Sequence, residues 1–168
     1  MSVESAALLL SGQEGGEIPV GVFAIAAPGE DGKTKILFRL RLGGPALLTG
    51  QTGGVLRVEI SLYMLDAAGG VQASELETVE VDLAALREAV EGSGVDFLGS
   101  FELRPGSYSL RMLARNLETR KLGVRSAALQ VPDAATLQAQ SLPVAPAVDV
   151  RPTARASGLG PYDPPFFP

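Results

Sequence analysis

The chain has 168 residues, a net charge of −5 and a hydrophobic content of 46%, which is enough for one domain with a full core. Its acidic balance argues against a nucleic-acid partner and against electrostatic docking on anionic membranes. Because cysteine and histidine are both absent, disulfides, thiolate metal sites and histidine-based acid–base chemistry are excluded. No apolar run is long enough for a transmembrane segment, and residues 6–10, preceded by Glu4, are too short for a secretory signal.

Short apolar runs separated by glycine, proline and aspartate predict an all-β fold. Residues 4–10 are a weak candidate for an edge strand, and residues 18–26, 34–42 and 55–65 are stronger candidates. Residues 43–54 form a Gly-rich connection that is too long for a tight hairpin. In the stronger strands, every second side chain is apolar and is predicted to face a core. These inward rows are Ile18, Val20, Val22 and Ala24, then Ile36, Phe38, Leu40 and Leu42, then Leu56, Val58, Ile60, Leu62 and Met64.

The second half of the chain contains the one predicted helix, at residues 82–91. Asp82 can cap its first turn by accepting a backbone N–H, and glycines follow its last turn. Its apolar face consists of Leu83, Leu86 and Val90. The strand before it, residues 71–82, carries acidic side chains that are predicted to form an outward row of Glu75, Glu77 and Glu80. Strands at residues 95–103, 108–115 and 122–131 bring the predicted total to about seven.

A turn at Pro105 and Gly106 leads directly into the strand that begins at Tyr108. This arrangement predicts a tyrosine corner, in which the ring packs in the core and the hydroxyl bonds back to the backbone before the turn. The whole pattern predicts an immunoglobulin/fibronectin III-like β-sandwich in residues 1–133, with one short helix. The long basic side chains on the outward rows are predicted to be solvated, and they are Arg39, Arg41, Arg57, Arg111 and Arg115.

Residues 134–168 have a different composition and are predicted to be an extended tail. Seven of the 12 prolines lie in residues 143–168, and the apolar alternation ends. Three aromatic side chains within this Pro-rich stretch, Tyr162, Phe166 and Phe167, are typical of a docking peptide and are the predicted partner-binding residues. The alternative is a solvated linker, or the beginning of a following domain.

The region of residues 18–133 resembles a module of bacterial, acidobacterial-type von Willebrand factor A-related proteins. The motifs that carry the resemblance are Ile18-Pro19-Val20, Asp31-Gly32-Lys33-Thr34, Leu103-Arg104-Pro105-Gly106-Ser107-Tyr108-Ser109-Leu110-Arg111, Leu122-Gly123-Val124-Arg125-Ser126 and Val131-Pro132-Asp133. The resemblance implies an immunoglobulin-like module in a cell-envelope or secreted context, without catalytic residues of its own. The Asp-x-Ser-x-Ser metal-ligand loop of the family's A domain does not occur in this chain. The resemblance therefore implies no metal site, and the chain itself carries no signal peptide that would support the implied location.

The sequence contains no motif that converges on catalysis or on a cofactor. Neither a Gly-x-Ser-x-Gly elbow nor a Gly-rich phosphate loop is present, and an enzyme based on serine, lysine or carboxylates lacks a recognisable constellation. Glu30, Asp31 and Asp133 could gather as calcium ligands, but turn acids more often shape turns. We expect a non-catalytic structural or protein-interaction subunit that binds protein partners, or assembles with itself, through its tail and strand edges. The alternative is a ligand- or glycan-binding accessory module of a secreted or envelope protein, although the chain has no tryptophan for stacking on sugars.

Overall fold

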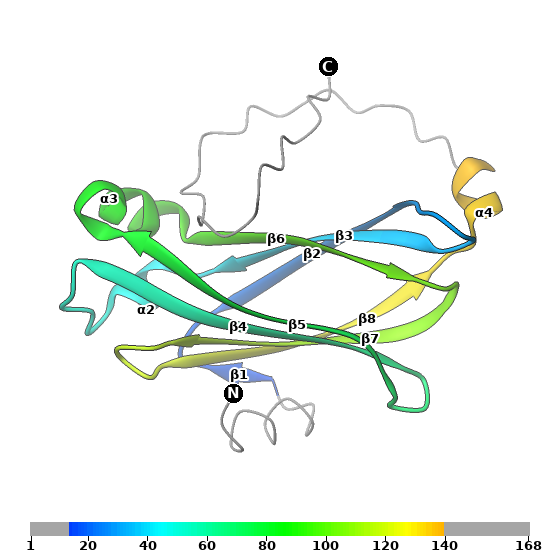
Figure 1. The fold of residues 1–168 in the computed structure, drawn as a ribbon. Coiled ribbons are helices and arrows are strands. Elements are labelled where there is room, and N and C mark those ends of the chain that lie inside the picture. Colours follow the sequence, from blue (N-terminus) through cyan, green and yellow to red (C-terminus); the bar gives the residue numbers. More distant parts are fainter. Residues whose placement is uncertain (1–13, 140–168) are drawn as a thin grey trace.

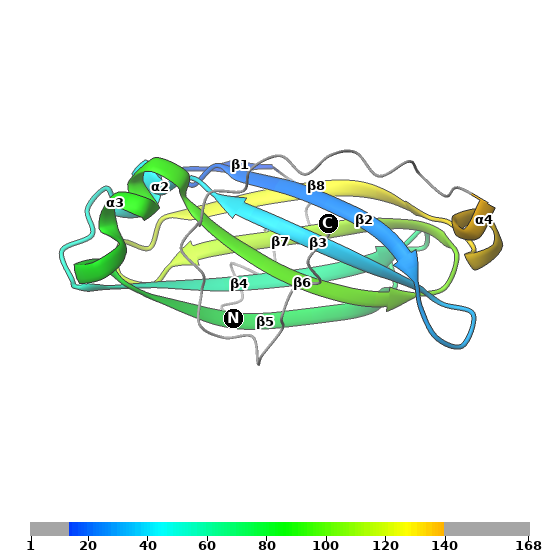
Figure 2. The same ribbon diagram turned by 90° about the horizontal axis from the view of Figure 1, so that it is seen from above.

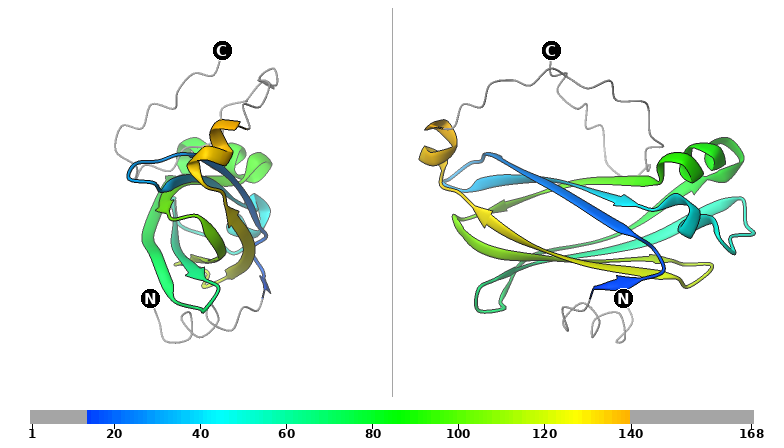
Figure 3. Two further views of the ribbon diagram at one scale, coloured as in Figure 1. Left: turned by 90° about the vertical axis from the view of Figure 1, so that its right-hand side faces the viewer. Right: turned by 180° about the vertical axis from the view of Figure 1, so that it is seen from behind.

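The computed structural model describes residues 14–139, and within them two antiparallel β-sheets face each other across a common core (Figures 1 and 3). Seven long strands form these sheets together with one strand of two residues, so the predicted immunoglobulin/fibronectin III-like β-sandwich is confirmed. The candidate strand at residues 4–10 and the segment 140–168 lie outside the described residues. Within residues 14–139, no helix has the length and hydropathy needed to cross a membrane.

The five-stranded sheet has the strand order β1-β8-β7-β4-β5, and the three-stranded sheet has the order β2-β3-β6. The strands of the first sheet are β1 (Gly15–Gly16), β8 (Leu122–Val131), β7 (Gly106–Asn116), β4 (Val55–Asp66) and β5 (Val71–Asp82). Those of the second sheet are β2 (Val20–Pro28), β3 (Thr34–Leu42) and β6 (Val95–Leu103). The bounds of β3, β5, β6 and β8 are those predicted, whereas β4 differs from prediction at one end and β2 and β7 differ at both ends, in each case by one or two residues.

The structure contains three short helices within the described residues, where the sequence predicts one. The predicted helix is α3 (Leu83–Ser93), and Asp82 caps it by accepting the N–H of Ala84 at 2.9 Å. The additional helices are α2 (Gly44–Leu48), inside the predicted Gly-rich connection, and α4 (Ala134–Ala139), at the beginning of the predicted extended tail. Helices α2 and α3 lie together at one end of the sandwich, and α4 lies at the other end (Figure 1).

A tertiary contact explains α2, and a local cap explains α4. Helix α2 has only five residues, but Leu47 in it is completely buried. A side chain at Gly44 would place Cβ 1.7 Å from the carbonyl oxygen of Val90, so α2 packs closely against α3 and depends on that contact. Helix α4 begins at a cap, because Asp133 accepts the N–H of Thr136 at 2.6 Å.

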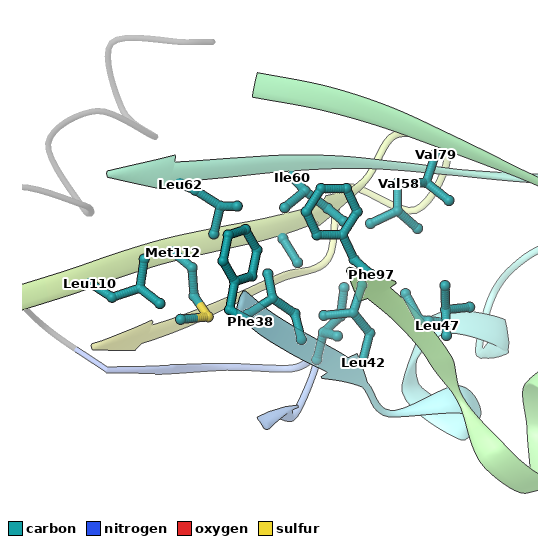
Figure 4. Close-up of a cluster of buried hydrophobic side chains, with 14 of the residues drawn as sticks. Phe38, Leu42, Leu47, Val58, Ile60, Leu62, Val79, Phe97, Leu110 and Met112 are labelled. Carbon is teal, nitrogen blue, oxygen red and sulfur yellow. The ribbon is translucent and has the colours of Figure 1, made fainter. Parts of the chain in front are cut away.

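The core between the sheets is made of the inward rows that the sequence predicts (Figure 4). Alternating residues of β3, β4 and β7 are buried, and the Phe38 ring lies 5.2 Å from the Phe101 ring and 6.1 Å from the Phe97 ring, measured between centroids. Each fully buried large apolar side chain contributes about 1.5–3 kcal/mol to stability. Burial of these rows is therefore the main driving force for the sandwich.

Strand β5 contradicts the predicted outward placement of Glu75 and Glu77, whereas Glu80 faces outward as predicted and pairs with Arg57 on β4. Glu75 and Glu77 occupy core-side positions, because they share the alternation of the buried Val79 and because the register sets them opposite Leu62 and Ile60. The core tolerates these two carboxylates because β5 is an edge strand of the five-stranded sheet, and side chains at the edge of a sheet can still reach water. Inward-pointing charges also prevent an edge strand from pairing with another chain. Burial, and then the neighbouring Glu77, raise the pKa of Glu75.

Candidate interaction surface

The outer side of the three-stranded sheet carries apolar side chains that remain open to solvent. Strand β2 is apolar on both sides, so its alternation places one row in the core and turns the other row outward. In that outward row Phe23 is 63% exposed and Ile25 is 46% exposed. In the register Ile25 pairs with Leu37 on β3, whereas Phe23 pairs with Arg39, which in turn pairs with Leu98 on β6. We call this surface, made of Phe23, Ile25, Leu37 and Leu98, the Phe23 face; Figure 2 views the molecule from this side.

Two arginines of β3 share one carboxylate: Arg39 lies between Phe23 and Leu98 within the Phe23 face, and Arg41 lies at its border. Arg41 donates to both oxygens of Asp96, at 2.8 Å each, and Nε of Arg39 lies 3.4 Å from the same carboxylate. The hydrogen bond to Asp96 raises the pKa of Arg41. Pairs this exposed add only about 0–1 kcal/mol to stability. Their main effect is to hold two guanidinium groups in place beside Phe23, and the outward placement predicted for these arginines is confirmed.

The last strand of the chain, β8, belongs to the five-stranded sheet, but its end is fastened to the three-stranded sheet. The Thr34 hydroxyl on β3 donates to the carbonyl oxygen of Pro132 at 2.7 Å, which ties the end of β8 to the three-stranded sheet. Helix α4 follows and packs beside β2. The tail residues Tyr162, Phe166 and Phe167 lie outside the described residues, and α4 is the last described element before them.

The predicted corner lies between β6 and β7, at the end of the sandwich where α4 also lies. The Tyr108 hydroxyl donates to the carbonyl oxygen of Arg104 at 2.9 Å, and its ring packs against the core. This is the contact that defines a tyrosine corner. Pro105, Gly106 and Tyr108 therefore hold the turn, and their role is structural.

A polar network at the opposite end joins the β3–β4 connection to the β7–β8 turn. The buried Asn116 donates to the carbonyl oxygen of Leu47 at 3.0 Å and to the side-chain oxygen of Gln51 at 3.1 Å. Its own oxygen accepts the N–H groups of Glu118 at 2.8 Å and Thr119 at 3.0 Å. All four hydrogen bonds are internal, so this cluster braces two loops and leaves no polar group for a ligand.

Glu118 completes this network from its exposed side. Its carboxylate accepts the Thr52 hydroxyl at 2.6 Å, the Thr52 N–H at 2.8 Å and the Gly53 N–H at 3.2 Å, and it also accepts from the side-chain amide of Gln51. These donors, the Thr52 hydroxyl foremost, lower the pKa of Glu118. The hydrogen bonds that join the Glu118 carboxylate to the β3–β4 connection thus explain its low pKa, and no catalytic role is needed to explain it.

The acidic residues considered as calcium ligands have structural roles or remain apart. Asp133 caps α4, and the Thr136 N–H lowers its pKa. Glu30 and Asp31 lie in the turn between β2 and β3, where the N–H of Lys33 bonds to the carbonyl oxygen of Glu30. Among residues 14–139, no group of three or more acidic, histidine or cysteine side chains is placed to hold a metal ion.

Sequence reasoning missed the Phe23 face, although a signal for it was present. The core row of β2 was identified, but Phe23 and Ile25 on the other side of the strand received no role. A strand of a half-exposed sheet normally alternates apolar with polar residues. Consequently, two large apolar residues at outward positions were the feature that indicated an uncovered apolar surface.

The predicted strand-edge contacts have four edge strands to use in the part of the chain that the structure describes. These are β1 and β5 in one sheet and β2 and β6 in the other. The inward carboxylates of Glu75 and Glu77 disfavour pairing along β5. The Phe23 face is thus the more favourable surface for a partner protein.

No family model matches this chain, and no curated protein matches it either. Similar solved structures include a β-glucuronidase from Bacteroides uniformis, with 12% identity, a TM-score of 0.45 and coverage of 66% of this chain and 13% of that one. A putative β-galactosidase from Bacteroides fragilis has 11% identity, a TM-score of 0.47 and coverage of 66% and 16%. The putative ApaA protein from Bordetella pertussis has 12% identity, a TM-score of 0.41 and coverage of 71% and 95%. This chain spans only a small part of the two glycosidases, and similarity at this level supports no functional assignment.

Proposed function

We propose that this chain is a non-catalytic protein-interaction subunit, a β-sandwich scaffold that binds a partner protein through the Phe23 face and through the tail 134–168. The observation that carries the proposal is the exposure of Phe23 and Ile25 on the outer side of the three-stranded sheet, in its edge strand β2. Contiguous exposed apolar side chains on a soluble fold mark interaction sites. Interface cores are moreover enriched in aromatic residues and arginine, which is the composition of this surface.

The chemistry of the Phe23 face indicates the kind of partner that fits. Its rigid strands supply a flat apolar patch, so the partner needs an apolar patch of its own to cover Phe23. Arg39 and Arg41 share Asp96 as their acidic partner, so a carboxylate on the partner finds a guanidinium at the border. Burying the remaining exposed area of Phe23 and Ile25 contributes about 2–3 kcal/mol, or roughly 30- to 150-fold in affinity.

The tail supplies the second part of the proposed interface. Because α4 packs beside β2, a partner on the Phe23 face lies next to the point from which the tail departs. Tyr162, Phe166 and Phe167 can each bury an aromatic ring there, while the surrounding prolines limit the entropy lost on binding. Two weak contacts on one scaffold reinforce each other through their effective concentration.

Capture from native extract, combined with photo-crosslinking, tests the proposal in the full chain. A Phe23→Ser/Ile25→Ser variant and a Tyr162→Ala/Phe166→Ala/Phe167→Ala variant are compared with Val71→Ser, which alters an apolar residue that is 53% exposed at the far end of β5. We expect a protein to co-purify at a fixed ratio with the parent and with Val71→Ser, and to be lost with the first variant and weakened with the second. It should crosslink to a photoreactive residue placed at Ile25 and not to one placed at Val71.

Two results would contradict the proposal. One is retention of the same partner by both the sheet and the tail variants, and the other is the absence of any protein at a fixed ratio. The second result would favour the alternative of a ligand- or glycan-binding module. Circular dichroism of each variant shows whether lost binding reflects a lost fold.

A further inference from the structure

The two sheets do not contain the same number of long strands. In the larger sheet β8, β7, β4 and β5 have 10–12 residues each, whereas the smaller sheet contains only β2, β3 and β6. Strand β2 lies beside β8 on one side of the sandwich, where the N–H of Ile18 donates to the carbonyl oxygen of Leu122 at 3.1 Å. Counted from that side, β2, β3 and β6 face β8, β7 and β4. Strand β5, on the other side, is therefore left without a facing strand (Figure 2).

The core-side row of β5 shows the consequence of this difference. At the end of the strand that helix α3 covers, Val79 and Val81 are 0% and 2% exposed. Ala73, Glu75 and Glu77 belong to the same row but are only partly buried, whereas the core-side row of the neighbouring strand β4 is buried throughout. The first half of β5 thus lacks the layer that covers the other long strands.

Strand β6 (Val95–Leu103) has a free edge on this same side of the sandwich. It pairs with β3 in unbroken register over all nine residues, and within residues 14–139 its other edge pairs with no strand. Every second N–H and C=O along that edge therefore lacks a backbone partner in this part of the chain. Edge strands are usually protected by proline, lysine, a bulge or an inward charge. Strand β6 has none of these, so its edge is open to pairing.

The other three edge strands are less suited to accept a further strand. Strand β1 has only two residues, and β2 lies beside β8. Strand β5 carries the inward carboxylates of Glu75 and Glu77, which disfavour direct pairing along it. A strand that instead adds to β6 occupies the position above β5 and covers its half-exposed row.

The charges of β5 and β6 indicate the composition of such a strand. Neither strand contains lysine or arginine, and together they carry six carboxylates, on Glu75, Glu77, Glu80, Asp82, Asp96 and Glu102. Arginines pair with Glu80 and Asp96, and Asp82 caps α3. Among the described residues, the other three have no ion-pair partner.

Two of these unpaired carboxylates lie where the added strand would pass. Burial, and then the neighbouring Glu77, raise the pKa of Glu75. A positive charge placed over these two residues offsets both effects, because an opposite charge favours the ionised carboxylate. The core-side positions of the added strand therefore suit lysine or arginine.

We propose that an extended basic segment of a partner protein adds to the free edge of β6 as a fourth strand of that sheet, with lysine or arginine side chains facing Glu75 and Glu77. In this mode of binding, main-chain hydrogen bonds provide affinity and alternate side chains provide specificity. The added strand pairs the free edge of β6 and completes the layer above β5. The inference goes beyond the proposed function, because it requires no partner on the Phe23 face.

Fluorescence anisotropy of a labelled peptide tests this inference in the full chain. The probe has nine residues, the length of β6, with lysine and valine in alternation, and glutamate replaces lysine in a control peptide. We expect the lysine peptide to bind and the glutamate peptide not to bind. Glu75→Gln/Glu77→Gln should weaken binding roughly three- to tenfold. Glu88→Gln/Glu91→Gln, which removes two exposed carboxylates from α3, should bind the peptide like the parent.

Backbone methylation and a disulfide locate the bound peptide. In an extended peptide the N–H groups of the lysines point to one edge and those of the valines to the other. N-methylation of one set should therefore weaken binding roughly tenfold or more, and N-methylation of the other set should not. A peptide with cysteine at one valine position should form a disulfide with Ser100→Cys, at an exposed position of β6, and not with Ser74→Cys on β5. The chain has no other thiol.

Four results overturn the inference: absence of binding, equal binding of the glutamate peptide, equal effects of the two methylation patterns, and trapping at Ser74→Cys. A disulfide-linked dimer of Ser100→Cys that forms without peptide, together with a dimeric parent in size-exclusion chromatography, also overturns it, because a second copy then occupies the edge. Urea unfolding shows whether each glutamine variant keeps its fold. Phe23→Ser/Ile25→Ser should bind the lysine peptide like the parent, so this inference and the proposed function can fail separately.

Discussion

Replacing Asn116 by alanine should destabilise the sandwich strongly, because one buried side chain joins two loops at its end. Asn116 is completely buried and makes four hydrogen bonds, two as donor and two as acceptor. Alanine leaves the carbonyl oxygen of Leu47 and the side-chain oxygen of Gln51 without this donor, both in buried residues. At about 1–3 kcal/mol for each buried polar group left unpaired, and with the two N–H groups closer to water, we expect a total loss of about 2–4 kcal/mol.

Thermal and urea unfolding measure this loss, and a neighbouring substitution provides the control. For a chain of this size the melting temperature should fall by roughly 6–12 °C. Thr119→Val changes the same turn at a hydroxyl that has no hydrogen-bond partner among the described residues, and it should change stability by less than about 0.5 kcal/mol. If Asn116→Ala is as stable as Thr119→Val, then the network does not hold the loops and the reasoning fails.

Three further substitutions test individual contacts. Tyr108→Phe removes the corner hydrogen bond to Arg104 and should cost about 0.5–1.5 kcal/mol in urea unfolding; an unchanged midpoint would argue against the corner. Glu75→Gln should stabilise the protein at pH 7, because the raised pKa of Glu75 means that its ionised form is disfavoured in the folded state. That gain should be absent below the ordinary value of 4.5, where the carboxyl is protonated in both states, and complete above the raised pKa; a gain that is the same at every pH would refute this explanation. Glu118→Gln should destabilise the protein at pH 7, because the pKa of Glu118 is lowered. The difference from the parent should shrink as the pH falls below 4.5 and through the lowered pKa, and a difference that persists at the acidic end would contradict the role given to its hydrogen bonds.

Local patterns explain why much of the strand layout was predictable. The alternation in residues 34–42 marks Ile36, Phe38 and Leu40 as inward, and all three are buried. The Asp82 cap depends on residues adjacent in sequence, as does the tyrosine corner that ends at Tyr108, so short-range chemistry is enough to identify both. Helix α2 was missed because its Gly-Pro start does not favour a helix, whereas α4 (AATLQA) has good helix formers and a local cap at Asp133 that the tail assignment overlooked. Helix α2 depends on docking at Gly44 against α3, a contact between residues far apart in the chain.

The exposure of the outward-facing side chains, in contrast, depends on the tertiary structure. Alternation assigns Phe23 and Leu113 alike to outward rows, but one is exposed and the other is buried. Nor does alternation show that β5 is an edge strand, where Glu75 can take a core-side position and still reach water. The sequence by itself thus determined the strands, their two sides and the corner, because each of these depends on residues within a few positions of one another. Only the folded structure decides how far each outward side chain is exposed, because its neighbours come from strands that are distant in the chain.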